Sequence, residues 1–137
     1  MIEFRTGTSG LSPDQLEGPF FVGWPNPPDA KTHLRLLEGS DHVVLAVDQA
    51  TGRVVGYVTA ISDGVLSAFI PQLEVLPDYQ RRGIGTELVQ RLLEEIGDLY
   101  AVDAVIDPDV EPFYRHLGMA SARAVMLRNY ERQSGSA

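Results

Sequence analysis

The sequence predicts a single α/β (α+β) domain with a central mixed, mostly antiparallel sheet and helices on both faces. β-rich runs separated by turn residues fill 42–76, which is typical of an antiparallel meander. An amphipathic helix at 83–97 is followed by a strand at 100–106, which has to cross over to a parallel neighbour. The 137 residues suffice for one core. We expect the domain to span 1–130 and residues 131–137 to be a disordered tail.

The N-terminal part is predicted to contain one strand and two helices. Residues 2–6 form a short first strand. The run 12–15 (Ser-Pro-Asp-Gln) indicates a helix start, because serine can be the N-cap, proline takes the first helical position and glutamine closes a capping box. That short helix is expected to continue toward Phe20 and Phe21. A second helix is predicted from 29 to 37, ending at Gly39.

A proline-rich loop separates these two helices. Residues 23–28 read Gly-Trp-Pro-Asn-Pro-Pro, and proline removes backbone donors and restricts the residue before it. The loop carries the only tryptophan, Trp24, beside Phe20 and Phe21. The aromatic group can serve as one wall of an acceptor pocket or as a packed cluster that pins the loop. The two interpretations are compatible, and the structural one is slightly favoured.

The middle of the chain is predicted to be a meander. Residues 43–47 and 53–61 form a hairpin across a turn at 48–52. The turn residues at 62–64 lead into a third strand at 65–76.

The helix at 83–97 has the strongest periodicity of the chain. Its apolar residues recur every four positions, which marks a buried stripe. These residues are Ile84, Leu88, Leu92 and Ile96.

The C-terminal part is predicted to hold two more strands and a short helix. The weak alternation at 100–106 indicates a strand, and residues 110–117 form a helix that Gly118 ends. Residues 123–128 are expected to form the final strand.

The start of the long helix is suited to an anion. Gly83 and Gly85 lack a Cβ atom, so a ligand can approach the backbone closely. The first N–H groups of a helix have no intrahelical partner and lie at the positive end of its dipole. Arg81 and Arg82 add positive charge in a chain whose net charge is -8. The run is neither a Walker A loop nor a dinucleotide fingerprint, which would need a third glycine where Leu88 lies.

Composition excludes several other classes of function. The absence of cysteine excludes disulfides, thiolate metal ligands and a cysteine nucleophile. The three histidines lie far apart, so we expect no metal. The acidic balance argues against a nucleic-acid partner. No apolar run is long enough for a membrane span and the N-terminus does not look like a signal peptide, so we expect a cytoplasmic protein without a membrane partner.

Two motifs resemble those of the GCN5-related N-acetyltransferase (GNAT) family. The pattern Gln80-x-x-Gly83-x-Gly85, preceded by Leu73-x-Val75-x-Pro77, is similar to the family's acetyl-CoA-binding motif. The Phe-Tyr-x-x-x-Gly pattern at 113–118 is similar to its later helix motif, with methionine in place of the usual aromatic at position 119. The order of the predicted elements is also the family's. The resemblance implies that the strands at 65–76 and 100–106 splay apart.

The resemblance implies the transfer of an acetyl group from acetyl-CoA to a primary amine by direct attack. The pantetheine arm would lie in the splay against Leu73–Val75, and the pyrophosphate would rest on the N–H groups of Arg81–Thr86. Asp107 lies near the family's usual asparagine. The implied cosubstrate-binding residues are Leu73, Glu74, Val75, Gln80, Arg81, Arg82, Gly83, Ile84, Gly85, Thr86, Asp107, Phe113 and Tyr114.

Two residues are candidates for the chemistry. Tyr114 occupies the family's tyrosine position for protonating the leaving thiolate, although such a tyrosine is often half-buried packing. Glu74 is the candidate base, with a solvated or structural glutamate as an equal alternative. The family's usual base has no acidic counterpart at 66–70, so water is an alternative base. A backbone N–H near Leu73 is the candidate oxyanion donor.

Other functions and partners stay open at this point. A non-catalytic acyl-CoA-binding or sensory module is the main alternative, and a nucleotide-phosphate binder is a third. The acceptor is expected to be a small-molecule or peptide amine of unknown identity. Dimers are common in the family, so a homodimer is a candidate assembly, although no residue pattern encodes one.

Overall fold

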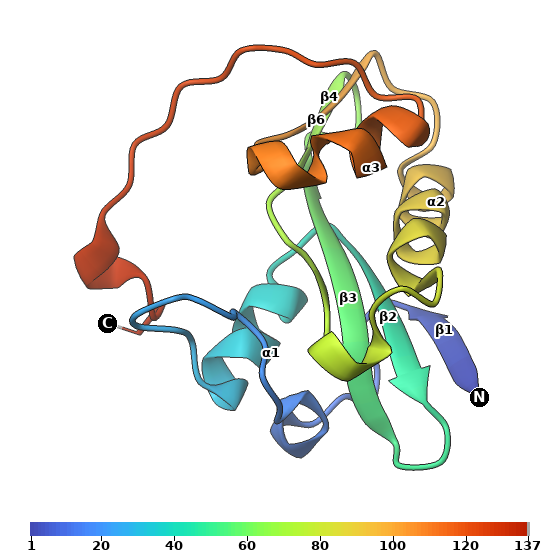
Figure 1. Cartoon of the computed structure of the whole chain (residues 1–137), viewed down its shortest axis with the longest axis vertical. Coiled ribbons are helices and arrows are strands. Elements are labelled where there is room, and N and C mark those ends of the chain that lie inside the picture. Colours follow the sequence, from blue (N-terminus) through green and yellow to red (C-terminus); the bar gives the residue numbers. More distant parts are fainter. Residues whose placement is uncertain (137) are drawn as a thin grey trace.

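The computed structural model describes residues 1–136, which form one mixed sheet with helices packed against it (Figure 1). The sheet order is β1-β2-β3-β4-β6, and β5 pairs with β3 farther along that strand. β4 and β6 are parallel and the other pairs are antiparallel, which confirms the predicted α+β domain. The strands are β1 (Ile2–Thr6), β2 (His42–Asp48), β3 (Arg53–Ser62), β4 (Ser67–Ile70), β5 (Leu73–Val75) and β6 (Ala101–Ala104). The α-helices are α1 (Ala30–Glu38), α2 (Ile84–Ile96) and α3 (Glu111–His116).

The third strand expected at 65–76 is two strands rather than one. Ile61 pairs with Phe69, whereas Val58 pairs with Leu73, so three steps along β3 face four steps along the other segment. The extra residue is a β-bulge, and it lies beside Pro71, which has no N–H to give to a ladder. β4 ends at the bulge next to β6, and β5 continues along β3 alone.

The two longer helices cover opposite faces of β3. Successive side chains of a strand point to opposite faces. The Tyr57 ring packs 4.6 Å from the ring of His33 on α1. A Cβ atom on the neighbouring Gly56 would lie 3.2 Å from Leu88 of α2. Figure 1 shows α1 and α2 on either side of β3, as this alternation requires.

The predicted buried stripe of the long helix is confirmed. Ile84, Leu88 and Leu92 are buried, and Ile96 packs against the core at its edge. The helix begins after Gly83, whose φ of 80° is left-handed, and ends before Gly97. The parallel pairing of β4 with β6 confirms the predicted crossover through α2.

The first predicted helix is shorter than expected. The capping box between Ser12 and Gln15 is present, but the helix is a single 3₁₀ turn, Pro13–Leu16. It stops because Gly18, at φ 144°, and the proline after it break the helical path. Phe20 and Phe21 therefore lie in a loop, where both are buried.

The prediction of a final strand at 123–128 is wrong. The segment is extended, but no strand of the described chain lies beside it, and Val125 and Leu127 are 99% and 96% exposed. A 3₁₀ turn at Tyr130–Arg132 brings the chain back, and the Asn26 N–H donates to the Gln133 side chain. The domain end at 130 and the disorder of 131–137 stay predictions, and Ala137 lies outside the described residues.

Within residues 1–136, no helix has both the length and the apolar character that a bilayer crossing requires.

Gly56→Ala is expected to lower the free energy of unfolding by about 1–3 kcal/mol. The added Cβ would lie 3.1 Å from the Glu74 carbonyl oxygen and close to Leu88 and Val75, where a paired strand cannot move away. Urea unfolding measures the change. Gly85→Ala is the control, because its Cβ would meet nothing closer than 3.6 Å. Equal stability of the two variants would contradict the close approach of α2 to β3.

Candidate functional site

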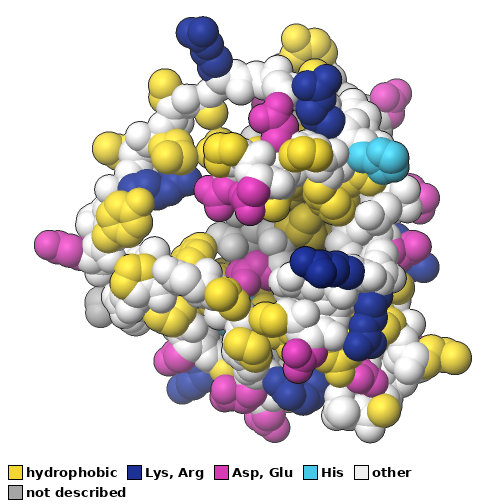
Figure 2. All heavy atoms as spheres, in the orientation of Figure 1, with side chains coloured by type: hydrophobic (Ala, Val, Ile, Leu, Met, Phe, Trp, Pro, Cys, Tyr) yellow, Lys and Arg dark blue, Asp and Glu magenta, His cyan; other side chains and the backbone are white. Residues whose placement is uncertain are grey.

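The divergence of β5 from β6 opens a cleft. A cavity of about 340 Å³ lies there. Figure 2 shows this face hollowed at its centre, with basic side chains on the side where α2 begins and acidic ones opposite. The lining residues come from β5, from the turns after β5 and β6, from the loop before α1 and from α3. They include Leu73, Glu74, Val75, Gln80, Ile106, Asp107 and Tyr114.

The edge of β5 that faces the cleft carries free backbone groups. The Thr59 N–H donates to the Gln72 carbonyl, and the Leu76 N–H donates to the Val55 carbonyl. Hydrogen-bonded and non-bonded pairs alternate in an antiparallel ladder. The backbone groups of Glu74 therefore face β3, and those of Leu73 and Val75 face away from it into the cleft. The Val75 carbonyl accepts from the Gln80 side chain at 2.9 Å, whereas the N–H groups of Leu73 and Val75 have no partner within residues 1–136.

The turn into α2 presents uncapped backbone donors. None of the N–H groups of residues 81–86 donates to another group within the described chain, and Gly83 supplies no side-chain cap. Arg81 and Gly83 both have left-handed φ values, 64° and 80°. A non-glycine residue there is uncommon, so the turn is held by its neighbours. The arrangement leaves the positive end of the α2 dipole available to an anion.

Side-chain contacts hold this turn in its conformation. Gln80 is tied to the Val75 carbonyl, and the Arg82 guanidinium donates to the Asp78 carbonyl at 3.0 Å while lying over the Tyr79 ring. The Tyr79 hydroxyl in turn donates to Asp48 at 2.6 Å. Gln80 and Arg82 therefore hold the turn in place, and Arg81 is exposed beside it.

Gly85 is not required by the protein's own backbone or packing. It lies inside α2 with a helical φ, and its nearest potential Cβ contact is Phe113 of α3, 3.6 Å away. Glycine in a helix costs about 1 kcal/mol relative to alanine. Because an alanine would fit here in ordinary contact with Phe113 and Val75, the close approach of a ligand to the backbone is the favoured reason for glycine.

Glu74 is held by two donors from different parts of the chain. Its carboxylate accepts from the Phe21 N–H at 2.7 Å and from the Tyr57 hydroxyl at 3.0 Å. Burial raises the pKa of Glu74, and these two hydrogen bonds offset part of that rise. Burial, together with the nearby Glu74 charge, also holds the pKa of Tyr57 far above its ordinary value, so its hydroxyl stays protonated.

Sequence reasoning missed Tyr57 and the Phe21 amide. Tyr57 lies directly opposite Glu74 in the β3–β5 ladder, and the residue pair becomes visible only once the bulge fixes the register. The Phe21 backbone has a left-handed φ of 57°, and no sequence signal predicts this conformation for a phenylalanine. The two donors connect the proline-rich loop to the cleft.

Tyr114 lines the same cleft from α3. Its side chain is 8% exposed, and burial raises its pKa, which keeps the phenol protonated at neutral pH. Asp107 also lines the cleft, as the residue before a 3₁₀ turn, and its side chain does not cap that turn. Residues 81–86 and Phe113 are not part of this lining, and Val75 and Gln80 connect the two regions.

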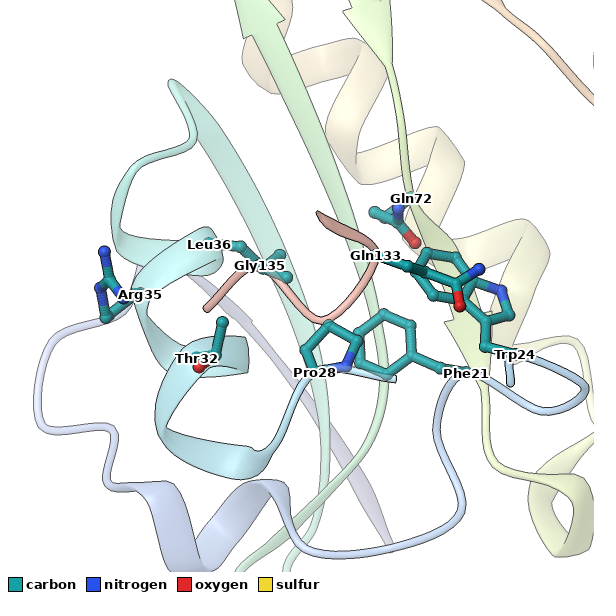
Figure 3. A pocket seen from close by; sticks show the side chains of 9 residues that line it. All are labelled: Phe21, Trp24, Pro28, Thr32, Arg35, Leu36, Gln72, Gln133 and Gly135. Carbon is teal, nitrogen blue, oxygen red and sulfur yellow. The ribbon is translucent and has the colours of Figure 1, made fainter. Parts of the chain in front are cut away.

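A second cavity of about 400 Å³ adjoins the first (Figure 3). The two share Trp24 and Gln72. Aromatic and apolar side chains form part of its wall, and the C-terminal segment closes one side. Its lining is Phe21, Trp24, Pro28, Thr32, Arg35, Leu36, Gln72, Gln133 and Gly135. The contribution of residues 133 and 135 could not be foreseen, because they are distant in sequence.

Among residues 1–136, no three His, Asp or Glu side chains gather as ligands for a metal ion.

A family profile described as "Acetyltransferase (GNAT) family" matches residues 13–119, which include the cleft, the α2 turn and α3. The chain belongs to the GNAT family. A Deinococcus radiodurans R1 protein assigned to the acetyltransferases has a crystal structure that is similar to it, with 48% identity and a TM-score of 0.95, covering 99% of this chain and 94% of that one.

Two curated plant relatives extend this comparison. GCN5-related N-acetyltransferase 1, chloroplastic, of Arabidopsis thaliana is 33% identical over 120 residues, which is 85% of this GNAT chain and 60% of the relative. Serotonin N-acetyltransferase 2, chloroplastic, of Oryza sativa subsp. japonica is 31% identical over 121 residues, with the same two coverages. The chain thus spans about three fifths of these relatives' length.

The buried Glu74 carboxylate predicts a pH dependence of stability. Because its folded pKa is raised, the protonated form is favoured, and its contribution to stability is full below the ordinary value of 4.5. That contribution is lost as the pH rises through the raised pKa. Glu74→Gln does not titrate, so the stability of wild type relative to this variant should fall as the pH rises above 4.5 and should level once the pH exceeds the raised pKa. Urea unfolding across that range checks it, and a difference that grows with pH would contradict it.

Proposed function

We propose that this GNAT chain transfers an acetyl group from acetyl-CoA to a primary amine. The observation that carries the proposal is two neighbouring sets of backbone donors with no partner within residues 1–136, one on the outer edge of β5 at Leu73 and Val75 and one at the uncapped start of α2. The strand edge suits the amide-bearing pantetheine arm, and the helix start suits a pyrophosphate.

Each part of the cosubstrate has a proposed partner in the chain. Leu73 and Val75 bind the pantetheine through backbone groups, and Gln80 keeps the Val75 carbonyl in position. The N–H groups of residues 81–86 bind the pyrophosphate, with charge from Arg81. Gly85 has no side chain, so the cosubstrate can approach the backbone of α2 closely. Asp107 and Tyr114 form the opposite wall.

The proposed reaction is a direct attack of the neutral amine on the thioester carbonyl. The Leu73 N–H stabilises the oxyanion, an effect of about 3 kcal/mol for one donor. As the tetrahedral species collapses, the C–S bond breaks and the Tyr114 hydroxyl gives its proton to the thiolate. The raised pKa of Tyr114 keeps that proton available at neutral pH. Positioning supplies much of the remaining rate.

Glu74 is the proposed acceptor of the amine proton, directly or through water. Burial raises the pKa of Glu74 toward neutral pH, and a general base works best when its pKa lies near the operating pH. Each carboxylate oxygen accepts one protein hydrogen bond, and a carboxylate oxygen has a further lone pair to use.

We place the body of the amine acceptor in the cavity that shares Trp24 and Gln72 with the cleft. Its aromatic and apolar wall suits an acceptor with a partly apolar body, either a small molecule or a peptide. A plant relative is named for serotonin and a soybean relative for histones, so acceptors differ widely within the family.

A non-catalytic acyl-CoA-binding module is the second candidate. It is favoured by the two protein donors already on Glu74, which would suit a purely structural carboxylate. Thiol release from acetyl-CoA with a panel of amines separates the two functions.

Coenzyme A at a hundredfold excess over its Kd should stabilise the protein by about 2.7 kcal/mol. Gly85→Val should weaken binding, because its branched side chain would cover the backbone that the cosubstrate is proposed to approach, beside Val75 and Phe113. Thermal melting with and without coenzyme A measures both effects. Gln90→Val, on the exposed side of α2, is the matched control and should keep the shift. Stabilisation by ATP but not by coenzyme A would overturn the proposal.

Tyr114→Phe should lower the turnover number several-fold or more while leaving the coenzyme A melting shift intact. The variant keeps the packing of the ring and removes only the proton donor. Steady-state kinetics with an amine that is turned over provide the measurement. Tyr100→Phe is the control, because that ring is 87% exposed on the surface. An unchanged rate in Tyr114→Phe would remove this residue from the mechanism.

A further inference from the structure

A tyrosine in the middle of β3 carries a hydroxyl that packing alone does not require. Tyr57 is fully buried, and its ring packs against the rings of Phe20 and His33 at centroid distances of 5.5 and 4.6 Å. A phenylalanine would present the same ring without a polar group to satisfy. A buried hydroxyl lowers stability unless it has a partner, and the partner of this one is the Glu74 carboxylate.

Strand register places the hydroxyl beside that carboxylate. Tyr57 and Glu74 lie directly opposite each other on β3 and β5, so their side chains share one face of the sheet. The Tyr57 hydroxyl donates to one carboxylate oxygen at 3.0 Å, and the Phe21 N–H donates to the other at 2.7 Å. Two donors from different segments thus fix both oxygens of a side chain that otherwise has several rotamers. Glu74 is held in one orientation at the cleft that it lines.

The fold does not need a carboxylate at this position. Glu74 is half-buried, and no salt bridge within residues 1–136 includes it. A carboxylate is unfavourable in such a place unless a cation compensates its charge, and an apolar side chain of similar size would suit the fold at least as well. A charged group kept under these conditions in a cleft is a candidate for function.

Hydrogen bonds rather than cations stabilise the charged form of Glu74. The described residues that line the cleft include no lysine, arginine or histidine, and their other titratable groups are Tyr114 from α3 and Asp107 after β6. On the α1 side, burial lowers the pKa of His33 to about 4, so this ring is neutral at pH 7. The adjoining cavity contributes Arg35, which is exposed. The charged form therefore depends on the two donors, and only the tyrosine donor belongs to a side chain.

We infer that Tyr57 is a positioning residue for the proposed acetyl transfer: its hydroxyl holds the Glu74 carboxylate at the cleft in the ionised form that accepts the amine proton. The inference rests on the proposed role of Glu74 as the base. During the attack, an N–H bond of the amine breaks, and the proton goes to a Glu74 oxygen and then to water. Tyr57 keeps its own proton throughout, because burial holds the pKa of its hydroxyl far above its ordinary value.

Tyr57→Phe should raise the pKa of Glu74, because a hydrogen bond to the charged form favours that form. Loss of a hydrogen bond to a charged group should move the titration midpoint up by about one pH unit. Carbon-13 NMR of the Glu74 carboxyl measures the midpoint without any substrate. Tyr79→Phe is the matched control, because it removes a hydroxyl that donates to a different carboxylate, that of Asp48, and it should leave the Glu74 midpoint unchanged.

The wild-type protein provides a readout that does not depend on the folding of Tyr57→Phe. The carbon-13 signal of the Tyr57 ring carbon that bears the hydroxyl should follow the Glu74 carboxyl signal with the same midpoint. In Glu74→Gln the tyrosine signal should not change over that pH range. A Tyr57 signal that ignores the titration of Glu74 would overturn the inference, as would an unchanged Glu74 midpoint in Tyr57→Phe.

The pH profile of kcat/KM separates positioning from packing. A mere loss of packing in Tyr57→Phe would lower the rate at every pH. The inference predicts instead that the acid limb of the profile moves to higher pH by the same interval as the Glu74 midpoint. Wild type and variant are compared with the same amine, so that the titration of the amine itself is common to both profiles.

Two kinetic outcomes distinguish this inference from the proposed function. Turnover in wild type with an acid limb that stays in place in Tyr57→Phe would overturn the inference alone. Absence of turnover in wild type with every amine of the panel, while coenzyme A still binds, would overturn the acetyl transfer on which the inference rests.

Discussion

One extra residue beside Pro71 determines the geometry of the cleft. The bulge shifts the pairing with β3 by one position, so that β4 stays next to β6 while β5 follows β3 alone. Without the shift, the segment could continue as one strand and close the sheet against the chain after β6. The bulge also turns Glu74 toward Tyr57 and directs the backbone groups of Leu73 and Val75 to the open side. The cleft thus follows from a local change in strand register.

A second constraint connects the cleft to the loop before α1. Glu74 accepts hydrogen bonds from the Phe21 amide and the Tyr57 hydroxyl, and both of these residues pack against the His33 ring. His33 is 1% exposed, and burial lowers its pKa to about 4, so its ring is neutral at pH 7. The aromatic residues pin the loop, as the sequence favoured. Phe21 and Trp24 also line the cavity next to the cleft, and the use of that cavity as an acceptor pocket stays a proposal.

Sequence patterns predicted the elements that depend on local signals. The α2 stripe, the capping box at Ser12 and the hairpin of β2 and β3 follow from periodicity and turn residues, and the crossover rule placed β6 beside the preceding strand. The candidate site residues on β5, α2 and α3 came from motif spacing. The structure brings those on β5, together with Gln80, Asp107 and Tyr114, to one cleft, whereas residues 81–86 and Phe113 lie outside its lining. The role of Tyr57 was missed because it depends on strand register. The part of Gln133 and Gly135 in the second cavity was missed because it depends on contacts between distant segments. The strand at 123–128 was predicted from composition, which says nothing about whether an edge lies within reach.

The central claim is that free backbone donors on β5 and at the start of α2 bind coenzyme A. Amide NMR during a coenzyme A titration tests it most directly. The largest shifts are predicted for residues 81–86 and for the amides of Leu73 and Val75, with a smaller change at Glu74, whose amide faces β3. If these amides do not shift and the changes concentrate around Thr32 and Arg35 instead, the account is contradicted.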